Sequence, residues 1–329
     1  MYENPDFKDV EDVCYESAHV ENVVSVIKKN FDGYFERFLE TCAGSVPSTL
    51  DFYKLREKFN VSYSGKNVER KFSGNYKNLI ISAIKDFESD REDYETILNK
   101  EFLEEYDDDP NAFKSQILKN KCPIIRKTLN SKNVEELKKY KMDFNQADPK
   151  LLLTVVENIC KFADEYKKNY NSSIYESAKS FEDLKMEVLD TESCTAYKVI
   201  GGGIKTQMLY KVYPGMFPYR SRDAIWAFWY LSGKETFDCE MSSEFLMIDT
   251  KNSVTRHNYF YPYRLFSWYA FVIYKLLKNE AVKYGVEIDV NYRYVIVDKF
   301  LQFVADEHRD EINFFKSQIK DGGVGYAYA

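Results

Sequence analysis

The sequence has little glycine and proline and no long apolar run. Its 329 residues include 13 glycines and 8 prolines, a scarcity that favours long helices over a fold with many tight turns. The longest apolar-rich segment, Leu265 to Leu277, is shorter than the roughly 20 residues that a membrane-spanning helix needs. These absences predict a mainly helical protein with no membrane partner.

Cysteine and histidine are too scattered for the common metal and redox motifs. The six cysteines occur singly, without a CxxC pair, and there are three histidines. Local spacing therefore assembles no zinc cluster, and dispersed thiols are typical of a reducing compartment. Because the acidic segment 1–12 lacks the pattern of a secretory signal, we expect a cytoplasmic protein.

An excess of positive charge is also missing. Lys and Arg number 46 against 53 Asp and Glu, which gives a formal charge of -7 and excludes a protein that coats nucleic acid by charge alone. Segment 119–141 is locally basic, with eight Lys and Arg against two Glu. A solvated helical face explains such a run more simply than phosphate binding does.

Aromatic residues are abundant and unevenly distributed. The chain has 27 Tyr, 24 Phe and 3 Trp, and all three tryptophans lie between residues 206 and 303. This change in composition predicts a helical domain over 1–190 and an aromatic-rich α+β domain over 191–329. Buried rings are favoured in cores and in oligomer interfaces alike, so the oligomeric state stays open.

Spacing patterns predict the secondary structure within these two parts. Apolar residues at three- and four-residue steps indicate helices over 21–42 and 75–106, and Asp148-Pro149 is typical of a helix start. In the second part we expect helices near 222–231, 262–284 and 299–319, a hairpin over 245–259 and a further strand over 292–297. The fold class is therefore mainly α, with a small antiparallel sheet or hairpin in the C-terminal part.

One acidic segment has the residues of a metal site. Asp238 and Glu240 precede the apolar run 245–248, which ends in Asp249 and Lys251. This order resembles the PD-(D/E)xK pattern of metal-dependent nucleases, although the leading Pro-Asp is absent. The resemblance implies that Asp238 or Glu240, together with Asp249, holds Mg²⁺ while Lys251 orients the attacking water. The alternative is a polar turn over 249–252.

Two further segments contain candidate anion-binding residues. Gly201-Gly202-Gly203 precedes Lys205 without the spacing of a P-loop, so it is either an anion site at a helix start or an ordinary connection. Arg220 and Arg222 flank Ser221, a good N-cap, and either bind a phosphate or carboxylate or pair with internal acids.

The same cation-and-ring character occurs in segment 256–264. Arg256, His257 and Arg264 lie there among tyrosines. If this segment meets Arg220 and Arg222 in space, the result is an aromatic, basic cleft that can stack a base or nucleotide. Separately, segment 55–72 resembles a helix-turn-helix with a long turn, and it would present Lys66, Arg70 and Lys71 to DNA.

Three functional interpretations follow. The first is a non-catalytic cytosolic binding protein without a cofactor, which engages a nucleic acid, a nucleotide or a protein partner through an arginine- and aromatic-lined C-terminal surface. The second is a Mg²⁺-dependent nuclease, and the third is a helical DNA-binding regulator.

Overall fold

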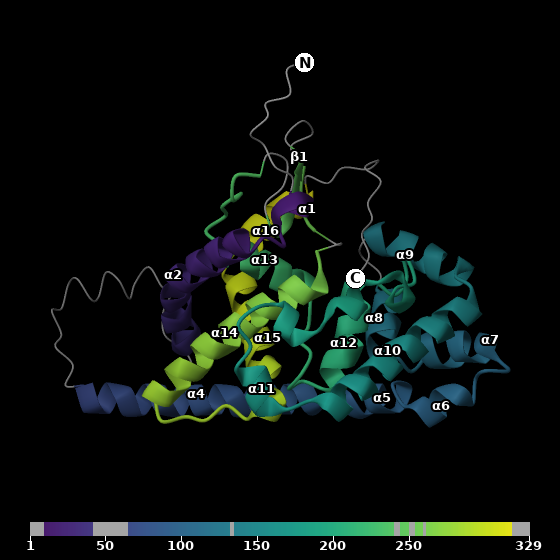
Figure 1. Ribbon diagram of the computed structural model, residues 1–329, viewed down its shortest axis with the longest axis horizontal. Helices are drawn as coiled ribbons and strands as arrows, with labels where there is room; N and C mark the ends of the chain where they lie inside the picture. Colours follow the sequence, from purple (N-terminus) through teal and green to yellow (C-terminus); the bar gives the residue numbers. More distant parts are fainter. Residues whose placement is uncertain are drawn as a thin grey trace, which may run out of the picture.

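The computed structural model describes residues 10–41, 65–131, 135–239, 244–249, 254–258 and 261–317, and within these it is mainly helical (Figure 1). No helix among the described residues combines the length and the apolar character that crossing a bilayer requires. The mainly helical fold predicted from the sequence is confirmed.

The first half of the chain contains both long and short helices. They are α1 (Val10–Val13), α2 (Ser17–Thr41), α4 (Gly65–Glu88), α5 (Arg91–Ile97), α6 (Lys100–Glu104), α7 (Pro110–Ala112), the π-helical turn η1 (Phe113–Leu118), α8 (Pro123–Asn130), α9 (Glu135–Gln146) and α10 (Pro149–Asn169).

The second half begins with short turns and continues with the most buried helices. It comprises α11 (Ser172–Glu176), the 3₁₀ turns η2 (Glu182–Leu184), η3 (Glu187–Asp190) and η4 (Glu192–Cys194), then α12 (Gly202–Val212), α13 (Arg222–Leu231), β1 (Leu246–Asp249), β2 (Val254–His257), α14 (Tyr263–Lys283), the 3₁₀ turn η5 (Val290–Tyr292), α15 (Arg293–Glu307) and α16 (Arg309–Ser317).

Helix α15 lies at the centre of the molecule. It packs against α13, α14, α4 and α2, so almost every side of its first half is covered. The third strand predicted over 292–297 is therefore wrong, because Tyr294 to Val297 are all buried within this helix. A short run that is apolar on every side carries no periodicity, and its β-branched residues then imitate a strand.

The predictions for α2, α10, α13 and α14 match the structure, whereas the helix predicted over 299–319 is divided between α15, which begins at Arg293, and α16. Helix α2 covers the predicted 21–42 segment, and Asp148 accepts a hydrogen bond from the backbone N–H of Lys150 at the start of α10. The single helix predicted over 75–106 is wrong, because it is divided into α4, α5 and α6. Asn99 causes one of these breaks, since its side chain caps α6 through the N–H of Phe102.

Strands β1 and β2 form one antiparallel pair, with Leu246 opposite His257 and Asp249 opposite Val254. This two-stranded pair forms no separate layer, and the elements around it are helices. Residues 42–64 lie outside the described part of the chain, and most of the predicted helix-turn-helix segment lies there.

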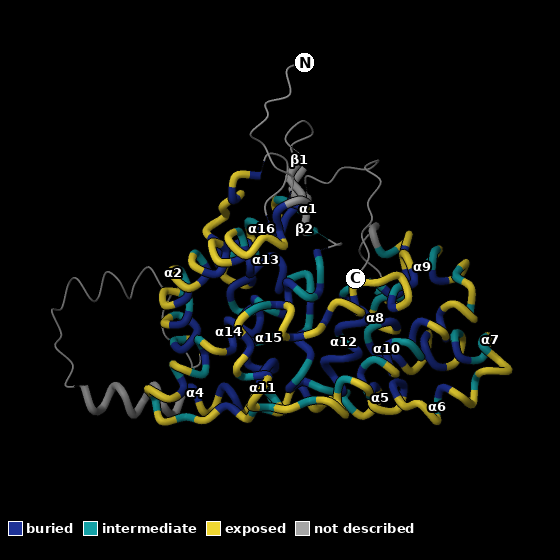
Figure 2. Tube along the Cα trace, viewed as in Figure 1, coloured by how far each residue is buried: buried dark blue, intermediate teal, exposed yellow. Residues whose placement is uncertain are grey.

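The buried side chains form one continuous cluster that includes both halves of the chain. Figure 2 shows buried segments concentrated along α12 to α15. Helix α12 connects the two halves, because it packs against α5, α8 and α10 of the first half. The division into domains at residue 190 stays a prediction.

Candidate anion-binding cleft

A cavity of about 440 Å³ lies where α8 meets the starts of α12 and α13. Its volume is in the range of roughly 300–1,000 Å³ that is usual for small-molecule sites. Polar and charged side chains contribute much of its wall: Lys127, Thr128, Gln207, Arg220, Ser221, Arg222 and Asp223. The predicted arginine pair therefore does converge on one concave site.

Ser221 fixes the start of α13 beside this cavity. Its hydroxyl oxygen accepts a hydrogen bond of 2.9 Å from the N–H of Ala224, as the N-cap prediction requires. The positive end of the helix dipole thus faces the cavity together with Arg222, which is the first residue of the helix. Gly203, in the first turn of α12, lines the same cavity.

Arg220 is buried and held in place by the backbone. It is 6% exposed, and its Nη2 donates a hydrogen bond of 2.9 Å to the carbonyl oxygen of Asn258, just after β2. Its own N–H donates to Thr206 Oγ1 on α12. Burial lowers the pKa of Arg220 to about 10, and the charge of Asp190 partly offsets this effect. At neutral pH the guanidinium keeps its charge.

Gly202 makes room for this guanidinium. A Cβ atom at position 202 would lie 2.2 Å from Arg220 Nη1 and 3.0 Å from Cζ. Gly202 of the predicted anion site or connection therefore has a packing role. It lets an arginine pack directly against the first turn of α12.

The charges around the cavity are unequal. Lys127 of α8 joins Arg220 and Arg222 in the wall, whereas Asp223 is the single carboxylate among the lining residues. Both oxygens of Asp223 accept hydrogen bonds from Arg309, at 3.0 and 2.9 Å. Arg309 thus compensates Asp223, and Asp90 Oδ2 lies 3.5 Å from Lys127 Nζ, so the charges of Arg220 and Arg222 make the cavity favour an anion.

A second chamber of about 250 Å³ adjoins the first, and the two share Lys127, Gln207 and Tyr219 as walls. Asp298 of α15 lines this chamber. Its Oδ2 accepts from Gln302 at 3.0 Å and from Tyr210 at 3.4 Å. Burial raises the pKa of Asp298 to about 7, although the Tyr210 hydrogen bond and the charges of Lys211 and Lys299 lower it in part.

Two of the predicted binding residues are used elsewhere. Lys205 is 5% exposed, and its ammonium group donates to the carbonyl oxygen of Leu189 and, at 2.9 Å, to Thr195 Oγ1. Burial lowers the pKa of Lys205 to about 8. Arg264 lies over the ring of Tyr15, with Cζ 3.9 Å from the ring centroid. Neither residue lines the cleft. The contacts observed for both cations lie within the fold, and their role as ligand-binding residues stays a prediction.

Arg256 and His257 are strand residues of β2, opposite Met247 and Leu246. The structure describes their backbone only, and their role as ligand-binding residues stays a prediction. Since the strand leads directly to Asn258, the partner of Arg220, the backbone of this segment does approach the arginine pair.

The proposed nuclease residues are only partly covered. Asp238 is exposed, with a left-handed φ of 65°, and Asp249 ends β1. Glu240 and Lys251 lie outside the described residues. Within the described segments, no three His, Cys, Asp or Glu side chains gather closely enough to hold a metal ion.

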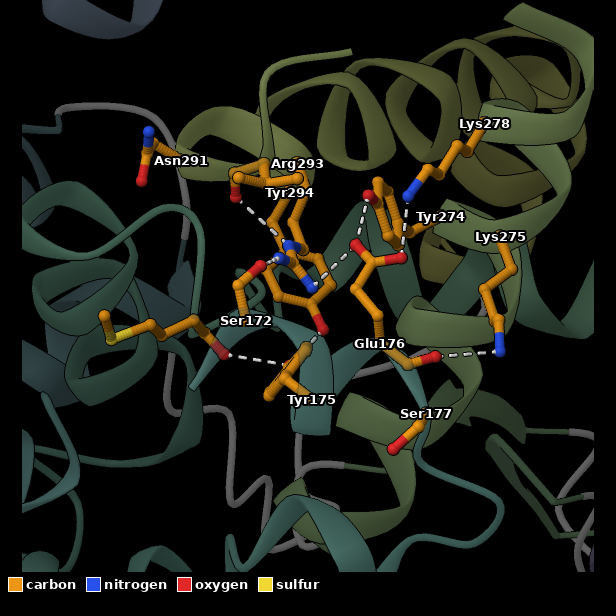
Figure 3. A network of polar contacts seen from close by, with 12 residues as sticks. Ser172, Tyr175, Glu176, Ser177, Tyr274, Lys275, Lys278, Asn291, Arg293 and Tyr294 are labelled. Carbon is orange, nitrogen blue, oxygen red and sulfur yellow. Dashed lines mark hydrogen bonds and ion pairs between the residues drawn. The ribbon is translucent and has the colours of Figure 1, made fainter. Parts of the chain in front are cut away.

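A second polar cluster, around Arg293, is internal (Figure 3). Arg293 is fully buried, and its Nη1 lies 3.4 Å from Glu176 Oε1. Glu176 also accepts hydrogen bonds of 2.6 Å from Tyr274 and 2.7 Å from Lys278. These contacts connect α11, α14 and α15, so we interpret the cluster as part of the fold.

Comparison with known proteins adds no homologue: no protein family, no curated protein and no solved structure matches this chain significantly. The function is therefore inferred from the site itself. The sequence identified Arg220 and Arg222 but not Gln207 and Asp298, which no local signal distinguishes from ordinary helical residues. Lys127 was assigned to a solvated face, and its side chain is indeed 74% exposed, although it also lines the cavity.

Proposed function

We propose that this protein binds a small phosphorylated molecule in the cleft between α8, α12 and α13. The observation that carries the proposal is the convergence of Lys127, Arg220 and Arg222 on one cavity of about 440 Å³. Two helix starts face the same space, and backbone N–H groups there favour anions. Three cations suit a doubly charged phosphate better than a single carboxylate.

Of the three interpretations of the sequence, this proposal is a specific form of the first, a binding protein with an arginine- and aromatic-lined surface. Tyr94 and Tyr219 supply the aromatic part of the wall, and Tyr219 stacks on Tyr210 with ring centroids 5.8 Å apart. The size of the cavity suits a nucleotide or a sugar phosphate.

The test is calorimetric titration of the full chain with pyrophosphate. Arg222→Gln and Lys127→Gln should each weaken binding roughly 10- to 100-fold, the loss of one charge-assisted hydrogen bond of about 1.5–3 kcal/mol. Arg126→Gln is the matched control, because Arg126 is exposed on the same helix and does not line the cavity.

Equal affinity in the wild type and in Arg222→Gln would contradict the proposal. Binding of a labelled oligonucleotide distinguishes a nucleic-acid partner from a small phosphorylated ligand. If that probe binds with strong salt dependence while pyrophosphate does not, the partner is a nucleic acid.

A further inference from the structure

The second chamber contains hydrogen-bond acceptors that the described part of the chain leaves without a donor. Gln207 Oε1 and Asp298 Oδ1 are both buried atoms with no hydrogen-bond partner there. Both residues line the chamber of about 250 Å³. A buried acceptor that lacks a donor costs about 1–3 kcal/mol, so two in one chamber indicate that something else donates to them.

The charged groups around Asp298 do not supply that donor. Lys211 Nζ lies 2.6 Å from Asp90 Oδ1 and also donates to the carbonyl oxygen of Phe87. Lys127 Nζ lies 3.5 Å from Asp90 Oδ2. Lys299 and Asp223 act on Asp298 through their charge, in opposite directions.

The two chambers therefore differ in what they attract. The first has more cations than carboxylates. In the second, Lys127, Lys211 and Lys299 are balanced by Asp86, Asp90 and Asp298, and two acceptors lack a donor among the described residues. The chambers share the walls formed by Lys127, Gln207 and Tyr219. One ligand can reach both chambers if it carries an anion at one end and a hydrogen-bond donor at the other.

We infer that the ligand is a phosphorylated amine, whose phosphate is held by Arg222 and Lys127 and whose ammonium group is held by Asp298 and Gln207. This inference rests on the function proposed above and adds the chemistry of the ligand's second end. An ammonium group fits better than a neutral hydroxyl, because it compensates the charge of a carboxylate that the protein surrounds.

The experiment uses ω-aminoalkyl phosphates with two to six methylene groups, each compared with the alkyl phosphate of equal length. Calorimetry on the full chain at pH 8 measures the affinity ratio of each pair. At one chain length the amine should bind at least about 10-fold more tightly, as expected for a charge-assisted hydrogen bond. The ω-hydroxyalkyl phosphates should gain less.

Two variants assign that gain to the chamber. Asp298→Asn should reduce the ratio to about threefold or less, because it weakens the binding of the amine more than that of the alkyl phosphate of equal length. Gln207→Met retains the side-chain length and should reduce the ratio in part. Circular dichroism and thermal unfolding test whether each variant is folded. If Asp298→Asn does not fold, the affinity ratio of Gln207→Met alone tests the inference.

The outcomes separate this inference from the proposed function. If alkyl phosphates bind but no amine gains at any length, or if the hydroxyl compounds gain as much, the phosphorylated amine is overturned and the phosphate site remains. A gain that persists in both variants also overturns the inference. If neither pyrophosphate nor any alkyl phosphate binds, the proposed function fails as well.

Discussion

Arg220 and Gly202 depend on each other. The guanidinium occupies the volume that a side chain at position 202 would need, and its hydrogen bond to Asn258 keeps it there. Because the arginine is buried, it has little freedom to move aside. The shape of the cleft therefore depends on the absence of a side chain at position 202.

Gly202→Ala should displace Arg220 and break its hydrogen bond to Asn258. We expect a loss of about 1–3 kcal/mol in the free energy of unfolding, typical of an overpacked site, and weaker pyrophosphate binding. Urea unfolding and calorimetry measure the two effects. Gly33→Ala is the control: its new Cβ would lie 3.7 Å from Arg37 Nη1, so alanine should be neutral or stabilising there. Equal stability of both variants would contradict this account.

Asp298 makes the stability depend on pH. Its pKa is raised from 3.8 to about 7 by burial, so ionisation costs more in the folded chain than in the unfolded one. Its contribution to stability is complete below about pH 4 and is lost as the pH rises through 7.

Asp298→Asn should therefore be more stable than the wild type at pH 8 and nearly equal to it at pH 4. Urea unfolding at a series of pH values measures the difference. Asp310→Asn, at an exposed position on α16, is the control and should show no such trend. A difference between Asp298→Asn and the wild type that stays constant from pH 4 to pH 8 would argue against a raised pKa.

The helices differ in how far their own sequence predicts them. Helix α2 has one buried stripe, which includes Val20, Ile27, Phe31 and Phe38, so the apolar spacing identified it. Helix α15 is covered by other helices, so its apolar residues show no helical period and the pattern could not distinguish a helix from a strand. A local pattern shows a helix clearly only where one side of that helix meets water.

The cluster around Arg293 connects α11, α14 and α15 through polar side chains (Figure 3). Burial would raise the pKa of Glu176, but hydrogen bonds from Lys278 and Tyr274 and the charge of Arg293 lower it below its ordinary value. The carboxylate therefore stabilises the fold above its unfolded pKa, and this contribution is lost as the pH falls through the lowered folded value.

Glu176→Gln should lower the free energy of unfolding by about 2–4 kcal/mol at pH 7, because it leaves the charge of Arg293 buried without its carboxylate. The loss should shrink in acid, where the wild-type carboxyl is protonated. Urea unfolding at pH 7 and in acid tests both parts. Glu182→Gln, at an exposed position on η2, is the control, and an equally small effect of both variants would refute this role for the cluster.

The cleft is assembled from segments that are distant in the chain. Lys127 belongs to α8, Gln207 to α12, Arg222 to α13 and Asp298 to α15. A boundary at residue 190 would place Lys127 in one part and the other three residues in the second. The candidate site thus lies where the two halves of the chain pack together, at the contact of α8 with α12.

The amino-acid sequence by itself determined the helical class, the positions of α2, α10, α13 and α14, and the closeness of Arg220 and Arg222, because apolar spacing, capping and chain adjacency are local properties. The sequence left open which partner each charged group contacts. In the sequence Lys205 and Arg220 look alike as candidate anion-binding cations, yet Lys205 donates to the carbonyl of Leu189 and Arg220 lines a cavity. Only the tertiary structure decides this, because the pairing of a charge depends on which distant backbone or side-chain atoms the packed helices bring within a few ångströms of it.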